Sequence, residues 1–161
     1  GCRSVMLKDY VKSAKEDTKR FNKAEVDEDL AELACDLVRT RGRRFNRGVV
    51  FKEWVELQHY SARGEYVLNE WRLWFGKGKL LEAVPNSFQP DDAARVPPGV
   101  LEQATQAALV IGSPYLTIDV AEAADGSWMA LEAGDGGVSG PAPGQDLHEH
   151  WAALASCFGC V

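Results

Sequence analysis

Apolar residues recur at steps of three and four positions in three segments, and this spacing predicts three helices. The first runs from Ala24 to a stop at Gly42, with acids near its start and bases near its end. The second ends at Gly112, and the third runs from Asp146, its predicted N-cap, to about Phe158. The side chains expected to be buried are Val26, Leu30, Leu33, Leu37 and Val38; Val100, Ala104, Ala107, Ala108 and Ile111; and Leu147, Trp151 and Leu154.

Strands are predicted where apolar and polar residues alternate. The clearest is 69–75, where Trp71, Leu73 and Phe75 share one face, and it turns into a partner strand at 79–83. With no regular alternation of strand and helix, the element order predicts an α+β fold with a mainly antiparallel sheet. Further strands are predicted at 5–7, 48–57, 115–121 and 127–133, a mobile loop at 12–23, and a Pro-rich connection at 85–98.

The strands 115–121 and 127–133 meet at Asp-Gly, residues 125–126, a dipeptide that favours a two-residue type I′ turn. In that turn the numbers of every opposing pair add to 251, so Asp119 lies directly opposite Glu132. The same register pairs Val120 with Leu131 on the other face, which is expected to pack on the core.

Two carboxylates that face each other on adjacent strands repel, so a cation is expected beside them. Mg²⁺ suits this pair, because it takes one or two carboxylates and completes its shell with water and phosphate oxygens. Asp135 adds a third carboxylate just past the strand end. The competing interpretation is a pair at a wet surface, where charge effects are small.

Charge is unevenly distributed along the 161 residues. The chain has 18 Lys and Arg against 24 Asp and Glu, but residues 1–63 hold 14 of those bases and 11 of the acids. A phosphate-plus-metal site would use both parts, although solvated helix faces give the same counts. No apolar stretch approaches the roughly 20 residues of a membrane span and no secretory signal is present, so a cytoplasmic location is expected. The initial Gly suggests a piece of a longer protein.

The cysteines and histidines form no complete site. Cys157 and Cys160 have the spacing of half a zinc site or a redox pair, but the other two cysteines lie far apart and supply no second pair. His148 and His150 lack the four-residue spacing that places two imidazoles on one helical face, so both are expected at the surface.

The hairpin and the residues after it resemble the metal-binding end of the ATP-grasp superfamily. The similarity is to a bacterial and phage clade with a Glu-x-Gly-Asp-Gly-x-Val-Ser-Gly ending, and segments 8–13, 50–57 and 69–75 follow in that clade's order. It spans Met6 to about Leu154. The residues that carry it are Tyr115-Leu-Thr-Ile-Asp-Val and Asp125-Gly-Ser-Trp-Met-Ala-Leu-Glu132-Ala-Gly-Asp135-Gly-Gly-Val-Ser-Gly140.

The resemblance implies an ATP-grasp-like α+β fold with flanking helices and a nucleotide cleft between a small N-terminal lobe and a C-terminal lobe. The chain, residues 1–161, would be a partial ATP-grasp domain. Residues 1–57 would form the small lobe and residues 58–161 the C-terminal lobe, and the family's further N-terminal lobe would be missing.

The resemblance also implies ATP and Mg²⁺ as cofactors, with Asp119, Glu132 and Asp135 at the metal. Lys8, with Lys12 as a second candidate, corresponds to the lysine that reaches the nucleotide phosphates, a role that suits a compact ammonium. Residues 51–56 resemble the hinge along which adenine lies. Its binding candidates are the Glu53 carbonyl, Trp54, the Val55 amide and, for the ribose, Glu56. Without the resemblance, exposed strand residues and a surface lysine are the simpler interpretation.

Arg72 resembles the family's arginine on the strand before the metal hairpin, where a guanidinium grips a phosphate or carboxylate bidentately. A salt bridge at the surface is the alternative. Two departures stand out: many members have Asn two residues after the metal-binding Glu, where this chain has Gly134 before Asp135, and the Lys-rich residues 12–23 replace a glycine-rich phosphate loop.

The implied function is an ATP-dependent carboxylate–amine (or thiol) ligase that works through an acylphosphate, with Lys8 and Arg72 as catalytic residues. Its substrates would be small-molecule or peptide carboxylates and amines, with no membrane partner. The alternative is a non-catalytic nucleotide-binding or interaction module that retains the fold. Nucleic-acid binding by the basic part is disfavoured, because the whole chain is acidic and has no RNA-binding motif.

Overall fold

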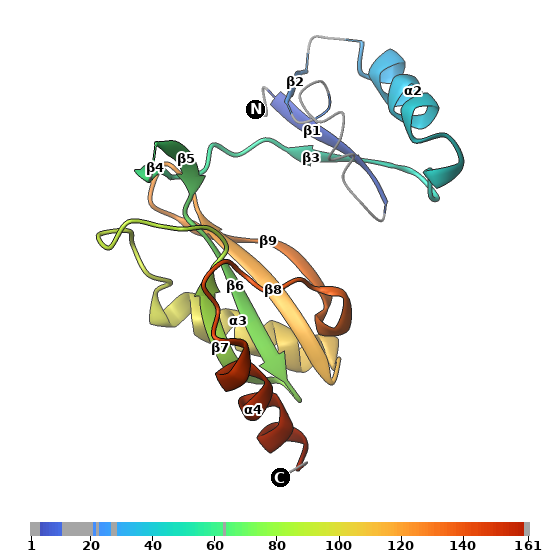
Figure 1. Ribbon diagram of the computed structural model, residues 1–161. Helices are drawn as coiled ribbons and strands as arrows, with labels where there is room; N and C mark the ends of the chain where they lie inside the picture. The colour runs from blue at the N-terminus through green and yellow to red at the C-terminus, as the bar shows by residue number, and fades with distance from the viewer. Residues whose placement is uncertain (1–3, 11–20, 22, 27–28, 63, 160–161) are drawn as a thin grey trace. The chain divides into compact units, whose positions relative to one another are not determined.

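The computed structural model describes residues 4–10, 21, 23–26, 29–62 and 64–159, and it consists of two compact units. Unit 1 is Gly1–Val55 and unit 2 is Glu56–Val161 (Figure 1). Lys12 and most of the predicted loop 12–23 lie outside the described residues. None of the helices that are described is long and apolar enough to cross a membrane.

Unit 1 is a three-stranded antiparallel sheet packed against one helix. The strand order is β2 (Ala24–Glu25), β1 (Ser4–Asp9) and β3 (Val49–Glu53). Helix α2 (Leu30–Arg41) is followed by a 3-10 turn, η2 (Gly42–Arg44). The buried side chains of this unit's core are Leu7, Phe21, Ala24, Leu33 and Leu37.

The first helix begins later than its apolar spacing predicts. Ala24 is buried in strand β2, and Val26 is 45% exposed. The N-cap is Asp29, whose side chain accepts hydrogen bonds from the amides of Ala31 and Glu32, both at 3.0 Å. This cap satisfies amides that have no partner within the helix, and it sets the start in place of the apolar spacing. The predicted end at Gly42 is confirmed.

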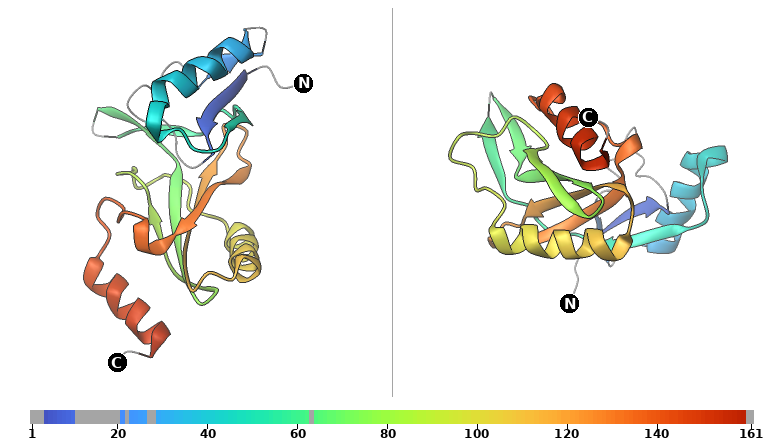
Figure 2. Two further views of the ribbon diagram at one scale, coloured as in Figure 1. Left: turned by 90° about the vertical axis from the view of Figure 1, so that its right-hand side faces the viewer. Right: turned by 90° about the horizontal axis from the view of Figure 1, so that it is seen from below.

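Unit 2 is built on a four-stranded antiparallel sheet with one helix on each side. The strand order is β7 (Lys79–Pro85), β6 (Glu70–Gly76), β8 (Tyr115–Glu122) and β9 (Trp128–Asp135). Helices α3 (Pro98–Ile111) and α4 (Leu147–Phe158) lie on opposite sides of this sheet in the right-hand view of Figure 2. A small hairpin of β4 (His59–Ala62) and β5 (Glu65–Leu68) was not predicted, because its four-residue strands show no clear alternation.

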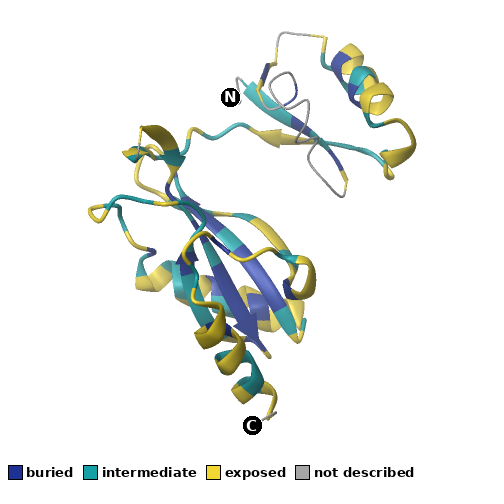
Figure 3. Cartoon of the chain, in the orientation of Figure 1, coloured by how far each residue is buried: buried dark blue, intermediate teal, exposed yellow. Residues whose placement is uncertain are grey.

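The predicted alternation along β6 and β8 is confirmed on the face that packs against α3. Figure 3 shows these two central strands as a strongly buried part of unit 2. The residues of this apolar core include Trp71, Leu73 and Phe75 of β6, Leu116, Ile118 and Val120 of β8, and Ala104 and Ala108 of α3.

Helix α4 buries a different side chain from those predicted. Leu147 and Trp151 are 45% and 55% exposed, whereas His150 is 3% exposed. The predictions of an apolar buried face and of a surface His150 are therefore wrong. The physical reason is that His150 finds hydrogen-bond partners on the sheet, Tyr115 and Glu82, which make burial of its ring tolerable.

The β8–β9 turn has three residues instead of the predicted two. The Ala123 amide donates to the Ser127 carbonyl at 2.7 Å, and Gly126 takes the left-handed conformation with φ of 84°. A type I′ turn would need positive φ at Asp125 as well, whereas in the three-residue loop only the glycine needs it.

A bulge then restores the predicted register farther along the hairpin. Val120 pairs with Ala130, so the predicted pairing of Val120 with Leu131 is wrong. The register shifts by one residue between Asp119 and Val120, and Asp119 pairs with Glu132 as predicted.

Candidate functional site

Three charged residues lie side by side on the sheet face opposite α3. Arg72 on β6 pairs with Asp119 on β8, and Asp119 pairs with Glu132 on β9. Directly opposed residues project on the same side, with β-carbons about 4.5–5.5 Å apart. We call Arg72, Asp119 and Glu132 the charged strip.

Arg72 and Asp119 form a bidentate ion pair. Arg72 Nε and Nη2 donate to the two carboxylate oxygens of Asp119, each at 2.8 Å, and Nη1 donates to the Gly140 carbonyl at 2.6 Å. The two side chains are only 18% and 13% exposed. The hydrogen bond to Asp119 is the main cause that raises the pKa of Arg72, opposed by burial and supported by the charges of Asp119, Glu70 and Glu132.

The guanidinium of Arg72 supplies a positive charge beside the two facing carboxylates. Of the two interpretations of Arg72, the salt bridge is therefore what the structure contains, and it is largely buried instead of exposed. The repulsion between Asp119 and Glu132 is relieved without a divalent ion. The like-charge argument thus finds the right residues but does not by itself require a metal.

The donor set of the charged strip still fits a divalent ion of the magnesium type. Such an ion needs one or two carboxylates from the protein, and Asp119 and the exposed Glu132 supply two. Among the residues that the structure describes, no three His, Cys, Asp or Glu side chains form a metal-binding group. Any ion here would therefore complete its shell with oxygens from elsewhere.

Asp135 occupies a different place from the other two acids. It pairs with Leu116, a residue of the α3 core, so the alternation of the strand puts it on the opposite face from Glu132. Its Oδ1 accepts a hydrogen bond from the Gly137 amide at 2.7 Å and caps the 3-10 turn η3 (Gly136–Val138). The structure does not bring Asp135 to the charged strip.

The remaining predicted residues follow β1 and the end of unit 1. Lys8 is half-buried on β1, and Glu53 is the exposed last residue of β3. The Trp54 amide donates to the Ser4 carbonyl at 3.0 Å and so continues the pairing of that strand with β1. Val55 ends unit 1, and the first residue of unit 2 is Glu56.

A family model described as an ATP-grasp domain, family 3 of its clade, matches residues 1–154. The chain belongs to this ATP-grasp family. The comparison with curated proteins found no match.

Solved structures of an ATP-grasp ligase named PsnB have the same fold as this ATP-grasp domain. The complex with minimal precursor, Mg and ADP aligns with a TM-score of 0.56 and 19% identity, over 97% of this chain and 47% of that one. The complex with precursor peptide PsnA2 and AMPPNP gives 0.53 and 16%, over 98% and 44%. The chain thus spans about half the length of these structures, and α+β architecture with a mainly antiparallel sheet is confirmed.

The ATP-grasp domain also holds buried polar groups that sequence reasoning missed. Asp9 is fully buried and accepts a hydrogen bond from Arg41 Nε at 2.6 Å. In unit 2, His150 is buried between Tyr115 and Glu82. Neither group has a local motif, because the partners lie 32 residues or more apart in sequence.

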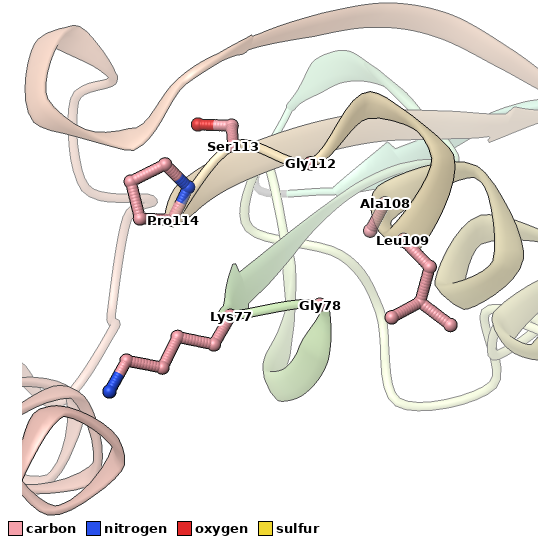
Figure 4. A pocket seen from close by; sticks show the side chains of 7 residues that line it. All are labelled: Lys77, Gly78, Ala108, Leu109, Gly112, Ser113 and Pro114. Atoms are coloured by element: carbon pink, nitrogen blue, oxygen red, sulfur yellow. The ribbon is translucent and has the colours of Figure 1, made fainter.

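One cavity of about 290 Å³ lies beside the end of α3, away from the charged strip. Lys77 extends from its rim toward α4 in Figure 4, and its Nζ lies 4.6 Å from the centre of the Phe158 ring. None of the predicted site residues lines it, so it is not part of the candidate site. The lining residues are Lys77, Gly78, Ala108, Leu109, Gly112, Ser113 and Pro114.

Proposed function

We propose that the chain is part of an ATP-dependent carboxylate–amine (or thiol) ligase that uses magnesium. The observation that carries the proposal is the charged strip, in which Asp119 and Glu132 oppose each other across β8 and β9 with Arg72 on the next strand. Membership of the ATP-grasp family supports it, as does the shared fold with a ligase whose complexes contain Mg and ADP.

Asp119 and Glu132 would hold the metal in this proposal, with Asp135 as a further candidate. Magnesium, when bound, would polarise phosphate oxygens and offset their negative charge. Arg72 keeps the Asp119 carboxylate aligned and remains charged itself, because its partners raise its pKa. An arginine in this position offers donors to a phosphate or a substrate carboxylate.

We propose that the first lobe, residues 1–57, binds the nucleotide and that the second, residues 58–161, holds the metal. Lys8 would bind phosphate oxygens, with Lys12 as a second cation. The main chain at Glu53 and Val55, flanked by Trp54, would contact the adenine edge. Glu56 would accept a hydrogen bond from the ribose, since a carboxylate is an acceptor suited to hydroxyl donors.

The proposed reaction has two steps. An oxygen of a substrate carboxylate bonds to the γ-phosphorus of ATP as the bond to ADP breaks, which gives an acylphosphate. An amine nitrogen or thiol sulfur then bonds to the acyl carbon, phosphate leaves, and the nucleophile loses its proton. Lys8 and Arg72 would stabilise the developing negative charge. The PsnB complex with a precursor peptide makes a peptide substrate the first one to test.

Titration calorimetry with Mg·ATP tests the metal pair. Asp119→Asn and Glu132→Gln are each expected to weaken Mg-dependent binding by roughly tenfold or more, because each removes a charged metal ligand. Asp92→Asn and Glu102→Gln make the same chemical changes at exposed positions and should bind like the unmodified protein. Equal affinity in all four variants would overturn the proposal.

A non-catalytic nucleotide-binding or interaction module is the second candidate. The observation that favours it is that Arg72 already engages both carboxylate oxygens of Asp119. This candidate predicts heat on addition of Mg·ATP but no release of ADP when carboxylate and amine substrates are added. Release of ADP that depends on both substrates would exclude it.

A further inference from the structure

His150 is a buried polar residue that the proposed function does not use. Its Nε2 lies 2.8 Å from the hydroxyl of Tyr115, and its Nδ1 lies 3.0 Å from Oε2 of Glu82. A carboxylate only accepts hydrogen bonds, so Nδ1 donates to Glu82, and Nε2 is left to accept the proton of Tyr115. The side chain of Gln145 donates to the same Glu82 oxygen at 2.7 Å. The order of these contacts fixes the direction of the Tyr115 hydroxyl.

Tyr115 is thereby held as a rigid plate against the segment that follows β9. Its ring stacks on Trp74 with centroids 5.5 Å apart, and burial, with the charge of Glu82, raises the pKa of its hydroxyl. The ring also lies so close to Gly136 that a β-carbon there would come within 2.6 Å of it. Only a glycine allows this approach without displacement of the ring.

Residues 136–140 are fastened to the same sheet face at two more points. The hydroxyls of Thr117 and Ser139 lie 2.8 Å apart, and the carbonyl of Gly140 accepts from Arg72 Nη1 at 2.6 Å. Tyr115, Thr117 and Arg72 therefore hold the segment in succession, and the last of these contacts belongs to the guanidinium that also grips Asp119. Figure 1 shows the segment between β9 and α4 passing beside the sheet.

We propose that Tyr115, His150 and Glu82 are positioning residues for the charged strip. They hold residues 136–140 in place, so that the Gly140 carbonyl keeps the third nitrogen of Arg72 occupied and its other two nitrogens directed at Asp119. The positioning is a property of the chain itself, and its consequence for ligand binding rests on the proposed function.

The polar character of this cluster is the reason to separate positioning from mere stability. An apolar contact has no preferred direction, whereas a satisfied chain of hydrogen bonds fixes each partner's orientation. Leu101 supplies the contrast, because it is half-buried against the α3 core, on the opposite face of the sheet from these groups. Leu101→Ala should lower stability without altering Arg72.

Tyr115→Phe tests the proposal, because it removes one hydroxyl and keeps the ring. Proton exchange at Arg72 Nε is measured by nitrogen-edited NMR in the full chain without ligand, with the resonance assigned by its loss in Arg72→Lys. Exchange is expected to be roughly threefold faster or more in Tyr115→Phe and in His150→Ala, and unchanged in Leu101→Ala. No change in Tyr115→Phe and His150→Ala, or equal acceleration in Leu101→Ala, would overturn the positioning role.

Mg·ATP titration of the same variants separates this inference from the proposed function. If the unmodified chain binds Mg·ATP, Tyr115→Phe should bind severalfold more weakly and Leu101→Ala equally well. If the unmodified chain does not bind Mg·ATP, the proposed function fails, and the exchange measurement alone decides the positioning role.

Discussion

The two faces of the four-stranded sheet in unit 2 are stabilised by different interactions. The face toward α3 is hydrocarbon: Leu73, Phe75 and Ile118 are at most 3% exposed. The face toward α4 carries the Arg72–Asp119 ion pair and the hydrogen bonds of His150. One set of strands thus builds a non-directional core on one side and a directional polar layer on the other.

The difference between the faces indicates a division of roles. Burial of hydrocarbon contributes in proportion to area and tolerates small shifts, so the α3 face suits the folding of the unit. Paired charges and hydrogen bonds contribute less net free energy but fix geometry, so the α4 face suits the holding of a ligand. Substitutions on the two faces should therefore differ in size and in kind.

Leu73→Ala should have the largest effect on stability. Leu73 is 0% exposed in the α3 core, and loss of a buried leucine side chain costs about 2–5 kcal/mol of unfolding free energy. Urea denaturation measures it. Leu109→Ala, at a side chain 55% exposed on α3, is the control and should stay within about 0.5 kcal/mol. Equal losses would remove the distinction between buried and exposed apolar positions.

Arg72→Met should have a smaller effect, and one that depends on Asp119. The change leaves a largely buried carboxylate without its partner. In a double-mutant cycle with Asp119→Asn, we expect a coupling of about 1–2 kcal/mol, discounted because both groups keep some contact with water. Arg95→Met with Asp119→Asn provides a control cycle at an exposed arginine, with coupling near zero. Additive effects in the Arg72 cycle would contradict the structural ion pair.

Asp146→Ala should cost about 1 kcal/mol, the usual value of an N-cap. The Asp146 side chain accepts from the amides of His148 and Glu149 at 2.9 and 3.1 Å and so begins the helix that carries His150. Thermal unfolding followed by circular dichroism measures the loss. His148→Ala, at an exposed position of the same helix, should have little effect, and a larger loss in His148→Ala would contradict the account.

The smallest effect is a pH dependence at Tyr115. Its pKa is raised by burial and by Glu82 above the ordinary value of 10.0, so the folded state holds the phenolic proton more tightly than the unfolded state does. Its contribution to stability is complete below pH 10 and is lost as the pH rises through the folded pKa. Denaturation of Tyr115→Phe at pH values above that ordinary pKa should lack this part of the loss, and identical slopes in both proteins would count against it.

The apolar face could be predicted from sequence because it repeats. Alternation placed Trp71, Leu73 and Phe75 together, and it needs no knowledge of distant residues. The same kind of reasoning misplaced the start of α2, where the local cap at Asp29 determines the boundary. It also missed the buried face of α4, where a histidine occupies a position that pattern reasoning reserves for hydrocarbon.

The polar face could be predicted only where residues are close in sequence. Asp119 and Glu132 belong to one hairpin, and a bulge compensates for the longer turn, so their pairing survives an incorrect turn type. The ion pair of Arg72 with Asp119 spans 47 positions, and the contact of Glu82 with His150 spans 68. No periodicity connects such residues, because their contact depends on the order of strands and on where α4 packs.

The most direct test of the charged strip is paramagnetic broadening by Mn²⁺ in nitrogen–proton NMR spectra, in the presence of ATP. The account predicts that the strongest broadening falls on amides around Asp119 and Glu132, and that Glu132→Gln removes it while Glu102→Gln does not. Broadening centred on another group of residues, or unchanged broadening in Glu132→Gln, would contradict the claim that these two carboxylates hold the ion.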